Sequence, residues 1–219
     1  MKKDVIKICE IFKSIQGEGM YQGLPAMFVR VSGCTRNCSM CDSKYHKNGT
    51  VYNVKDAAAK VASMLIVSNV HTVVLTGGEP LLYLPQIQKI IKRVGKFTNR
   101  ASWHLETNGD LIKTKRDADK IMKLFRYVCI SPKDVVTAER VSKIFVHYID
   151  LFYDIKVVTD LESFNVDLVP YATALQPLTT FNKKRDLKIK QKVWKYCANY
   201  GLLYSSRLHI EVWDNKRGV

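Results

Sequence analysis

Short runs of β-branched and apolar residues alternate along the chain with longer stretches in which apolar residues recur at helical spacing. Residues 5–12 and 26–32 are of the first kind and predict strands, whereas residues 53–67 predict a helix. Beyond them we expect strands over 71–75, 101–105, 127–130, 153–158, 171–175 and 207–212, and helices over 85–94, 116–125, 136–147 and 184–200. Such alternation predicts a single-domain α/β protein with a parallel sheet covered by helices, either an open sheet or a complete or partial barrel.

Polar residues and glycines that are uncommon inside a sheet follow the predicted strands. They are Gly33–Cys34, Thr76–Glu79, Glu106–Gly109, Ser131–Lys133 and Gln176–Pro177. Because α/β sheets and barrels build their sites where parallel strands end, we expect these segments to converge. The bare backbone of Gly77 and Gly78 would let a ligand approach, with Glu79 able to hold an amino-acid group, although two glycines there could also form only a tight turn.

Composition places the chain among globular proteins, since 219 residues with 47% hydrophobic residues suffice for one core. Neither a long apolar stretch nor a signal-peptide pattern occurs, so we expect a cytoplasmic protein without a membrane segment. The net charge of +15 favours anionic ligands or nucleic acid. The basic residues are spread through segments such as 89–96 and 183–195, which is equally typical of a solvated surface.

Three of the six cysteines crowd into one short segment, where Cys34, Cys38 and Cys41 have the spacing C-x3-C-x2-C. Cysteines this close in an intracellular chain are interpreted first as ligands of a metal or a cluster. Three thiolates can hold an iron–sulfur cluster that keeps one iron free of protein, or they can form a Cys3His zinc site with His46. The remaining cysteines fall on apolar faces and are expected to be buried thiols: Cys9, Cys129 and Cys197.

The cysteine spacing, followed by a Gly-Gly-Glu-Pro segment at residues 77–80, resembles the radical S-adenosylmethionine (SAM) enzymes. Further segments between residues 12 and 177 resemble one family of these enzymes, the 7-carboxy-7-deazaguanine synthases (QueE-like proteins). They are Phe12–Gly19, Phe28–Arg30, Gly33–Cys34, Cys41–Ser43, Glu106–Gly109, Ser131–Lys133 and Gln176–Pro177. Several matched segments in the same order are more specific than any one of them.

The resemblance implies a radical SAM core domain over residues 1–219, folded as a partial (incomplete) parallel α/β barrel and often homodimeric, with a cluster loop at 33–43. It implies a lyase that converts 6-carboxy-5,6,7,8-tetrahydropterin to 7-carboxy-7-deazaguanine with loss of ammonia. In that family a reduced [4Fe–4S] cluster cleaves SAM to a 5′-deoxyadenosyl radical, which takes hydrogen from C6 of the pterin, and SAM is regenerated. The electron would come from a flavodoxin-like protein or another reductant, and the protein would supply placement and electrostatics.

The matched motifs also imply which residues hold the cofactors. The cluster would be ligated by Cys34, Cys38 and Cys41. Adenine of SAM would lie against the backbone of Ser39 and Met40. The amino-acid and ribose ends of SAM would be held by Gly78, Glu106, Ser131, Lys133 and Gln176. No catalytic residue is expected beyond the cluster and SAM.

For the substrate, the resemblance implies backbone and amide contacts from Ile15, Gln16 and Gly17, with Thr76 beside the pterin. Arg30 would pair with the pterin carboxylate, a charge-assisted contact that suits a guanidinium. The family uses Mg2+, reached through a hydroxyl directly after the Cys-Asp pair, which here is Ser43. On residue type alone, Asp42 and Ser43 could equally cap a helix.

Two places depart from the family pattern. Met40 stands where an aromatic residue is common, and a thioether can still pack on adenine. The segment 207–219 differs more, since members usually close with Gln-x-His-Lys where this chain has Glu211-Val212-Trp213-Asp214. On the expected last strand, alternate residues from Arg207 to Trp213 share a face, so His209 or Glu211 could replace the missing group, Glu211 by accepting from the guanidine-like edge of the pterin.

Two other functions fit part of the sequence. A radical SAM activase, which makes a glycyl radical on a partner protein, shares the cluster motif, but residues 14–19 and 131–133 match the synthases. A zinc-stabilised nucleic-acid-binding protein would account for the +15 charge and for three cysteines with His46. Such a protein would be colourless, and its affinity for nucleic acid would fall steeply with salt.

Overall fold

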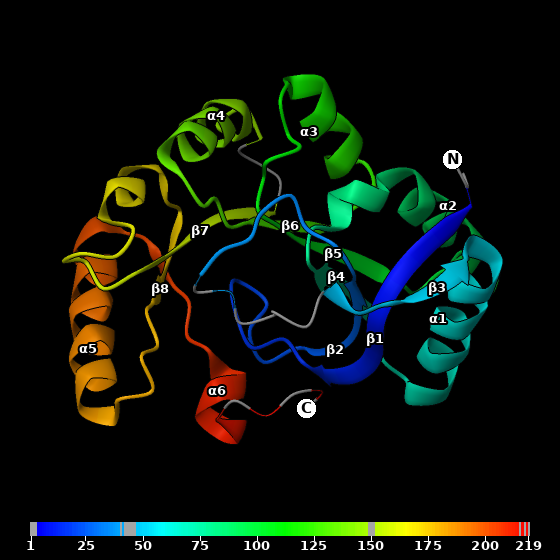
Figure 1. Ribbon diagram of the computed structural model, residues 1–219, viewed down its shortest axis with the longest axis horizontal. Helices are drawn as coiled ribbons and strands as arrows, with labels where there is room; N and C mark the ends of the chain where they lie inside the picture. The colour runs from blue at the N-terminus through cyan, green and yellow to red at the C-terminus, as the bar shows by residue number, and fades with distance from the viewer. Residues whose placement is uncertain are drawn as a thin grey trace.

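A nine-stranded sheet forms the centre of the computed structural model, which describes residues 4–39, 41, 47–148, 152–214, 216 and 218. Within this part of the chain the strand order is β3-β1-β2-β4-β5-β6-β7-β8-β9 (Figure 1). The strands are β1 (Val5–Ile15), β2 (Pro25–Val31), β3 (Thr50–Asn53), β4 (Thr72–Gly77), β5 (Ser102–Thr107), β6 (Tyr127–Ile130), β7 (Tyr153–Thr159), β8 (Ala174–Pro177) and β9 (Leu203–Tyr204). The helices are α1 (Val54–Ser68), α2 (Leu84–Val94), α3 (Lys115–Met122), α4 (Val135–Phe145), α5 (Lys183–Tyr200) and α6 (Leu208–Trp213), with 3₁₀ turns η2 (Pro80–Tyr83) and η3 (Val166–Tyr171).

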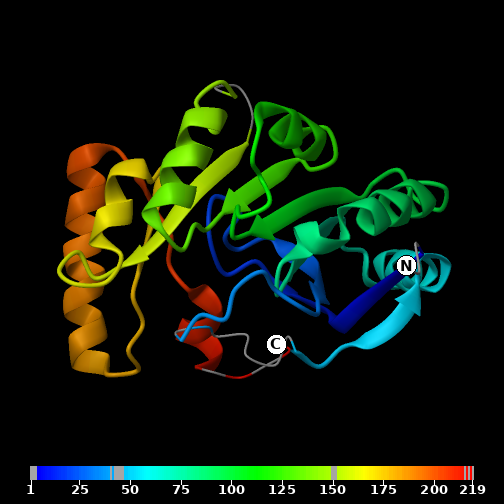
Figure 2. The same ribbon diagram turned by 45° about the horizontal axis from the view of Figure 1, so that its top comes forward.

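The sheet is parallel over most of its width. Neighbouring strands from β2 to β9 pair in parallel, and β1 alone runs antiparallel to its neighbours β2 and β3 among the described strands. The sheet is curved, with α1 to α5 following one another around its outer side and α6 at its open side (Figures 1 and 2). This arrangement confirms the predicted α/β class with a parallel, open sheet.

Alternation along the strands separates an apolar outer face from a polar inner face. Leu105, Val128, Ile155 and Leu175 pack into two apolar cores beneath the outer helices. Because successive side chains of a strand point to opposite faces, the residue after each of these points inward. The inner face therefore carries a row of functional groups across four strands: Glu106, Cys129, Lys156 and Gln176.

Local sequence sets the ends and the buried stripe of α5. Ile189, Val193 and Cys197 recur every four residues and are all buried against the sheet. Asn182 caps the amino end, where its side chain accepts a hydrogen bond from the amide of Arg185 at 3.1 Å. Gly201 ends the helix in the left-handed conformation at φ 68°.

The structure corrects the predicted elements at the carboxyl end. Residues 207–212 are not a strand, since Leu208–Trp213 form α6 and the amides of Ile210 and Glu211 donate to the carbonyl of Arg207. Strict alternation of polar and apolar residues misled the prediction, because the sheet position beside β8 is already taken by β9. The strand expected at 171–175 begins only at Ala174, after η3, and β3 was not predicted.

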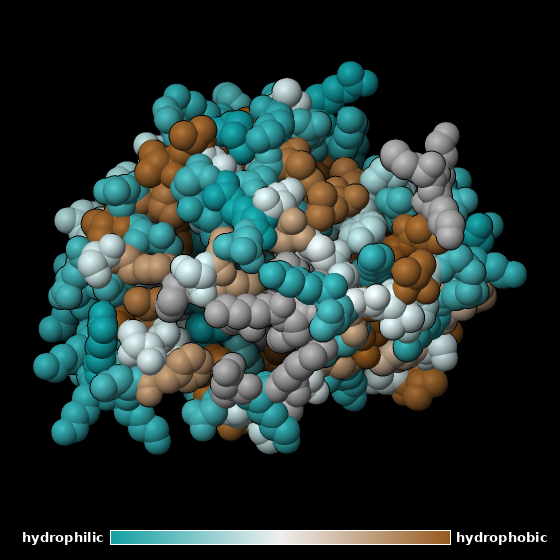
Figure 3. Space-filling view, in the orientation of Figure 1, coloured by the Kyte–Doolittle hydropathy of each residue, from teal (hydrophilic) through white to brown (hydrophobic). Residues whose placement is uncertain are grey.

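On the face shown in Figure 3, hydrophilic side chains surround the centre and apolar ones form small separate groups. No helix in the described part of the chain combines the length and apolarity that a bilayer crossing requires.

Candidate active site

The cysteine loop follows β2 and lies beside the loop after β5. Cys34, Cys38 and Cys41 are partly exposed, and Sγ of Cys34 lies 3.7 Å from Nδ2 of Asn108. Among the described residues, no group of three or more His, Cys, Asp or Glu side chains is arranged so that it could hold a metal ion. The donor chemistry nevertheless fits a cluster, since three thiols occur within eight residues at the end of a parallel strand.

Gly78 brings the loop after β4 into direct contact with the cysteine loop. Its amide donates to the carbonyl of Val31 at 3.0 Å, and the amide of Glu79 donates to that of Gly33 at 2.8 Å. A Cβ at position 78 would lie 1.8 Å from the carbonyl oxygen of Gly33, so the backbones can approach this closely only with glycine.

Glu79 is committed to holding the protein together. Its carboxylate is fully buried and accepts hydrogen bonds from the amide of Leu81, the hydroxyl of Thr107 and the amide of Asn108, at 2.7 to 3.0 Å. Burial raises the pKa of Glu79. The prediction that this carboxylate holds an amino-acid group of a ligand is therefore wrong, because its oxygens are occupied in joining β4 to β5.

A charged cluster that the sequence analysis missed anchors the cysteine loop. Nε of Arg36 donates to Asp110 at 2.7 Å, and its guanidinium also pairs with Asp134 at the start of α4. The hydroxyl of Thr35 donates to Asp110 at 2.7 Å. Although burial opposes it, the hydrogen bond from Arg36 holds the pKa of Asp110 below its ordinary value. An arginine between the cysteines was the available signal.

On the inner face, the segment after β1 meets the end of β5. Nε2 of Gln16 donates to Oε1 of Glu106 at 3.1 Å. Nζ of Lys156 lies 2.5 Å from Oε2 of Glu18 and 3.4 Å from Oε2 of Glu106. Lys156, with 4% of its side chain exposed, thus joins two carboxylates from distant parts of the chain. Neither Glu18 nor Lys156 was assigned a role from the sequence.

Helix α6 covers this segment from the carboxyl end of the chain. Nε of Arg207 donates to Oε1 of Glu18 at 3.3 Å, and Nε2 of His209 lies 3.9 Å from the same oxygen. The amide of Leu208 donates to the carbonyl of Gly17 at 3.0 Å. A Cβ on Gly17 would lie 2.3 Å from Nδ1 of His209, so glycine permits this close packing.

Glu211, also on α6, does not lie beside Glu18 as Arg207 and His209 do. Its carboxylate accepts from Nζ of Lys190 on α5 at 2.9 Å, with both side chains about two-fifths exposed. The prediction that Glu211 meets the pterin rested on a strand in which residues 207, 209 and 211 share a face. That prediction is wrong because a helical turn directs Glu211 toward α5 instead of toward Glu18.

Burial and charge together set the protonation of the cluster around Lys156. Although burial opposes it, Lys156 and Arg207 lower the pKa of Glu18 to about 2. Burial raises the pKa of Glu106, which Lys156 partly offsets. Burial alone would lower the pKa of Lys156, but Cys129, Glu106 and Glu18 raise it above its ordinary value. The lysine is therefore a fixed positive charge on the inner face.

Residues of β6, β7 and the loop after β9 also hold the segment that follows β1, at Gly19 and Met20. The amide of Gly19 donates to Oγ of Ser205 at 2.8 Å, and that of Met20 to Oδ2 of Asp154 at 3.3 Å. The hydroxyl of Tyr127 donates to Asp154 at 2.5 Å. Gln176, predicted to bind SAM, is buried with Oε1 3.5 Å from Oγ of Ser205. Rigid backbone anchoring of this kind suits a ligand-binding segment.

Of the residues predicted to meet substrate, Arg30 already has a partner. Its Nε donates to Oε1 of Glu10 on β1 at 2.7 Å, and its guanidinium lies over the ring of Phe12. Arg30 pairs in register with Thr76 on the neighbouring strand, so both lie at the same level of the inner face. Ile15, at the end of β1, is exposed.

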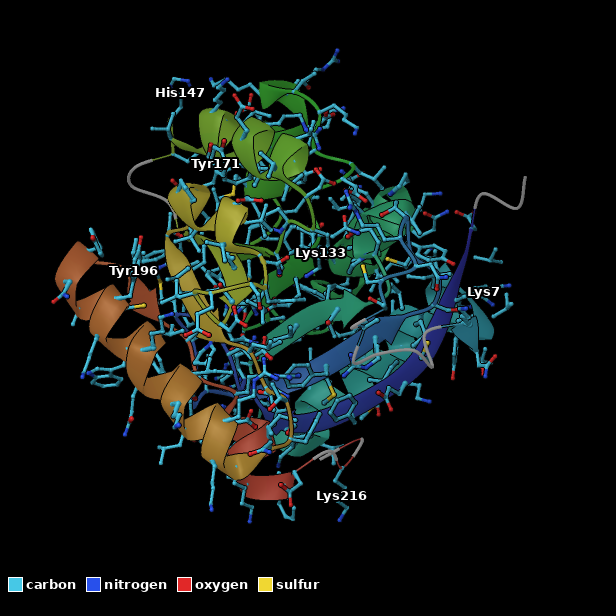
Figure 4. All side chains as sticks on the ribbon, turned by 60° about the vertical axis from the view of Figure 1, so that its left-hand side comes forward. Lys7, Lys133, His147, Tyr171, Tyr196 and Lys216 are labelled. Carbon is cyan, nitrogen blue, oxygen red and sulfur yellow. The ribbon has the colours of Figure 1, made fainter. Side chains whose placement is uncertain are left out.

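The two predicted SAM residues after β6 contact each other. Nζ of Lys133 donates to Oγ of Ser131 at 2.9 Å on the exposed rim of the sheet. Figure 4 shows Lys133 near the middle of the molecule in that view, well apart from Tyr196 on α5. The structure thus places Ser131 and Lys133 at the carboxyl end of β6, with Gly78 after β4, Glu106 at the end of β5 and Gln176 at the end of β8. Of the five neighbouring strands from β4 to β8, only β7 carries none of the predicted SAM residues.

Some predictions fall elsewhere. Met40, Asp42, Ser43 and His46 lie outside the described residues. Cys129 and Cys197 are buried as expected. Cys9 is only partly buried, with Sγ 3.7 Å from the carbonyl of Val31, which corrects its prediction as a core thiol.

Comparison with known proteins identifies the superfamily. The family model described as Radical SAM superfamily matches residues 28–146, which include the cysteine loop, the glycine pair and Glu106. The chain belongs to the radical SAM superfamily. As a radical SAM enzyme it is expected to use a [4Fe–4S] cluster and SAM, which the superfamily implies, and this accounts for three cysteines beside an open inner face.

Three similar proteins carry one name. A 7-carboxy-7-deazaguanine synthase of Hyperthermus butylicus is 28% identical over 228 residues, which cover 95% of this chain and 93% of that protein. One from Pyrobaculum aerophilum is 28% identical over 222 residues, covering 97% of both. One from Bacteroides thetaiotaomicron is 41% identical over 104 residues, covering 47% of this chain and 52% of that protein.

Solved structures share the fold. The crystal structure of QueE from Escherichia coli has a TM-score of 0.62 and 21% identity, covering 94% of this chain and 95% of that one. Streptococcus suis SuiB bound to S-adenosylmethionine has a TM-score of 0.54 and 17% identity, covering 79% of this chain and 44% of that one. The radical SAM fold, predicted from the motifs, is confirmed.

Proposed function

We propose that this radical SAM enzyme is a 7-carboxy-7-deazaguanine synthase, which converts 6-carboxy-5,6,7,8-tetrahydropterin to 7-carboxy-7-deazaguanine with loss of ammonia. The observation that carries the proposal is the similarity to synthases over nearly the whole length of both chains, 97% in the relative from Pyrobaculum aerophilum. The contact between Gln16 and Glu106 supports it, since it joins the substrate segment of the synthase motif to a SAM residue of the same motif.

Three thiols and a set of strand-end groups fit the cofactors. Cys34, Cys38 and Cys41 would hold the [4Fe–4S] cluster, while Glu106 would accept from the ribose hydroxyls of SAM. The other SAM contacts would come from Met40, Gly78, Ser131, Lys133 and Gln176. When bound, the cluster supplies an electron and SAM the means of removing a hydrogen atom, and the protein's part is to place the pterin and exclude water.

The substrate would lie between the segment after β1 and strands β2 and β4. Ile15, Gln16 and Gly17 would contact the pterin, Thr76 would lie beside it, and Arg30 would bind its carboxylate. Arg30 now pairs with Glu10, so binding would exchange one carboxylate for another on the same guanidinium. His209 would close the pocket from α6, since it lies against Gly17.

A magnesium ion would assist at the substrate through Ser43, as in the family resemblance. Serine provides the hard oxygen that Mg2+ prefers. Turnover with EDTA-treated enzyme, with and without added Mg2+, tests this part of the proposal.

We further propose a cytoplasmic homodimer that takes its electron from a flavodoxin-like protein or another reductant. The +15 charge would favour an acidic electron donor and anionic ligands. Nucleic-acid binding is an alternative use of the same charge, which salt-dependent binding would reveal.

Anaerobic turnover tests the proposed reaction. The enzyme is reconstituted with iron and sulfide and given SAM, Mg2+, a reductant and 6-carboxy-5,6,7,8-tetrahydropterin, and 7-carboxy-7-deazaguanine is sought by mass spectrometry. The proposal predicts product with the wild type and none with Cys38→Ala. Brown protein that cleaves SAM without forming product would overturn the substrate assignment and return the activase to consideration.

A further inference from the structure

One buried lysine joins the two halves of the candidate site. Lys156 lies on β7 between Glu18, from the segment after β1, and Glu106, at the end of β5, with Nζ at 2.5 Å and 3.4 Å from their carboxylates. Its side chain is 4% exposed. A buried ammonium is tolerated only when it is paired, so these contacts hold the lysine and the carboxylates in one arrangement.

The two carboxylates beside Lys156 differ in how many cationic side chains they contact. Glu18 is also paired with Arg207 and approached by His209. Glu106 has Lys156 as its salt-bridge partner and otherwise accepts from neutral Gln16 and from the thiol of Cys129. Without Lys156, Glu106 would face Glu18 across a poorly hydrated space, and like charges there repel strongly.

Glu106 and the substrate segment are therefore linked twice. Gln16 reaches Glu106 directly at 3.1 Å, and Glu18 reaches it through Lys156. In the proposed function Glu106 accepts from the ribose of SAM, and residues 15–17 contact the pterin. When SAM binds and orders Glu106, it therefore also orders the segment at residues 15–17 that binds the pterin, and the converse holds for the pterin.

We propose that Lys156 is a positioning residue that couples SAM binding at Glu106 to pterin binding at residues 15–17, so that each ligand strengthens the binding of the other. This inference rests on the proposed function and assigns Lys156 no contact with the reacting atoms. It concerns an energetic coupling between two binding sites, which a purely structural salt bridge would not produce.

The experiment measures that coupling at equilibrium. SAM is titrated by anaerobic calorimetry into cluster-loaded enzyme without reductant, in the absence and the presence of saturating 6-carboxy-5,6,7,8-tetrahydropterin. In the wild type the pterin should tighten SAM binding at least about fivefold, the lower end of typical couplings. In Lys156→Met, SAM alone should bind about tenfold more weakly, the effect of losing one charge-assisted contact, and the pterin should change its affinity less than about twofold.

Matched variants separate this role from a loss of stability. Lys192→Met removes another lysine that is paired with a carboxylate, Glu162, on the exposed surface and should behave like the wild type. Lys156→Arg should retain most of the coupling because it keeps the charge. Should Lys156→Met not fold, Glu18→Gln tests the same connection by removing the other partner of Lys156. This variant should reduce the coupling. SAM alone should bind within about twofold of wild type, since Glu106 keeps its salt bridge with Lys156.

Two results would overturn the inference. The first is full coupling in Lys156→Met, or in Glu18→Gln where that variant stands in. If coupling is full while SAM alone binds more weakly, Lys156 is only a support for Glu106. The second is a wild type that makes product but shows no coupling, in which case the proposed function survives. A wild type that neither binds SAM nor forms product removes the proposed function together with the inference.

Discussion

At the scale of single residues, the site depends on close backbone contacts and on charges brought from distant parts of the chain. Gly78 and Glu106 were named as candidate SAM residues from the sequence, because each lies within a short motif that resembles the family. Lys156 and Arg36 were not predicted, since what gives each its role is a partner far away: Lys156 meets Glu18 across 138 positions, and Arg36 meets Asp110 across 74. No short pattern encodes such pairs.

Gly78→Ala should prevent assembly of the cysteine loop. A Cβ would lie 1.8 Å from the carbonyl oxygen of Gly33, so the loop after β4 would move away from the thiols. We expect at least tenfold less iron per protein after reconstitution, together with a lower melting temperature. Gly95→Ala is the control, because a Cβ there comes no closer than 3.4 Å to its neighbours. Iron binding as in the wild type by Gly78→Ala would contradict this account.

His104 should make the protein sensitive to mild acid. It is buried between Tyr21 and Tyr127, its Nδ1 has no hydrogen-bond partner among the described residues, and burial, with Arg126 nearby, lowers its pKa to about 4. The folded state thus favours the neutral form of His104 more than the unfolded chain does. The contribution of neutral His104 to the free energy of unfolding is therefore fully present above the ordinary pKa of 6.5 and is lost as pH falls toward 4.

Urea unfolding at pH 7 and pH 4 measures this effect. The wild type should lose up to roughly 3 kcal/mol of unfolding free energy from His104 over that interval, and His104→Phe should lack this component. Equal pH dependence in the two proteins would show that His104 is protonated as easily in the folded state as in the unfolded chain.

At the scale of elements, hydrophobic periodicity predicted most helices and strands, because core-facing residues recur at the period of each element. It failed at α6, where polar and apolar residues alternate as in a strand. The helix is set by tertiary contacts instead: Leu208 bonds to Gly17, and Arg207 pairs with Glu18. A segment of six residues carries too little periodicity to reveal its state.

The two charged faces of α6 should differ in their effect on catalysis. His209→Ala should raise the KM for the pterin about tenfold or more, because His209 packs against Gly17, which we propose contacts the pterin. Glu211→Gln should leave kcat and KM unchanged, because Glu211 pairs with Lys190 away from that segment. Steady-state kinetics of both variants checks this, and equal effects would mean that α6 acts only through overall stability.

At the scale of the whole molecule, the order of strands and helices was sufficient to predict the parallel sheet. The position of polar residues after the strands predicted that they gather at one edge of it, where we propose the site. The structure adds what alternation cannot give: the segment after β1 folds into the inner face and is held there by Asp154, Ser205 and α6.

The central claim is that this enzyme, loaded with its cluster and SAM, removes a hydrogen atom from C6 of the pterin. The most direct measurement is anaerobic turnover of 6-carboxy-5,6,7,8-tetrahydropterin carrying deuterium at C6, with mass spectrometry of both the product and the recovered SAM. The account predicts 7-carboxy-7-deazaguanine together with deuterium in SAM, and neither with Cys38→Ala. Product without deuterium in SAM, or SAM cleavage without product, would contradict it.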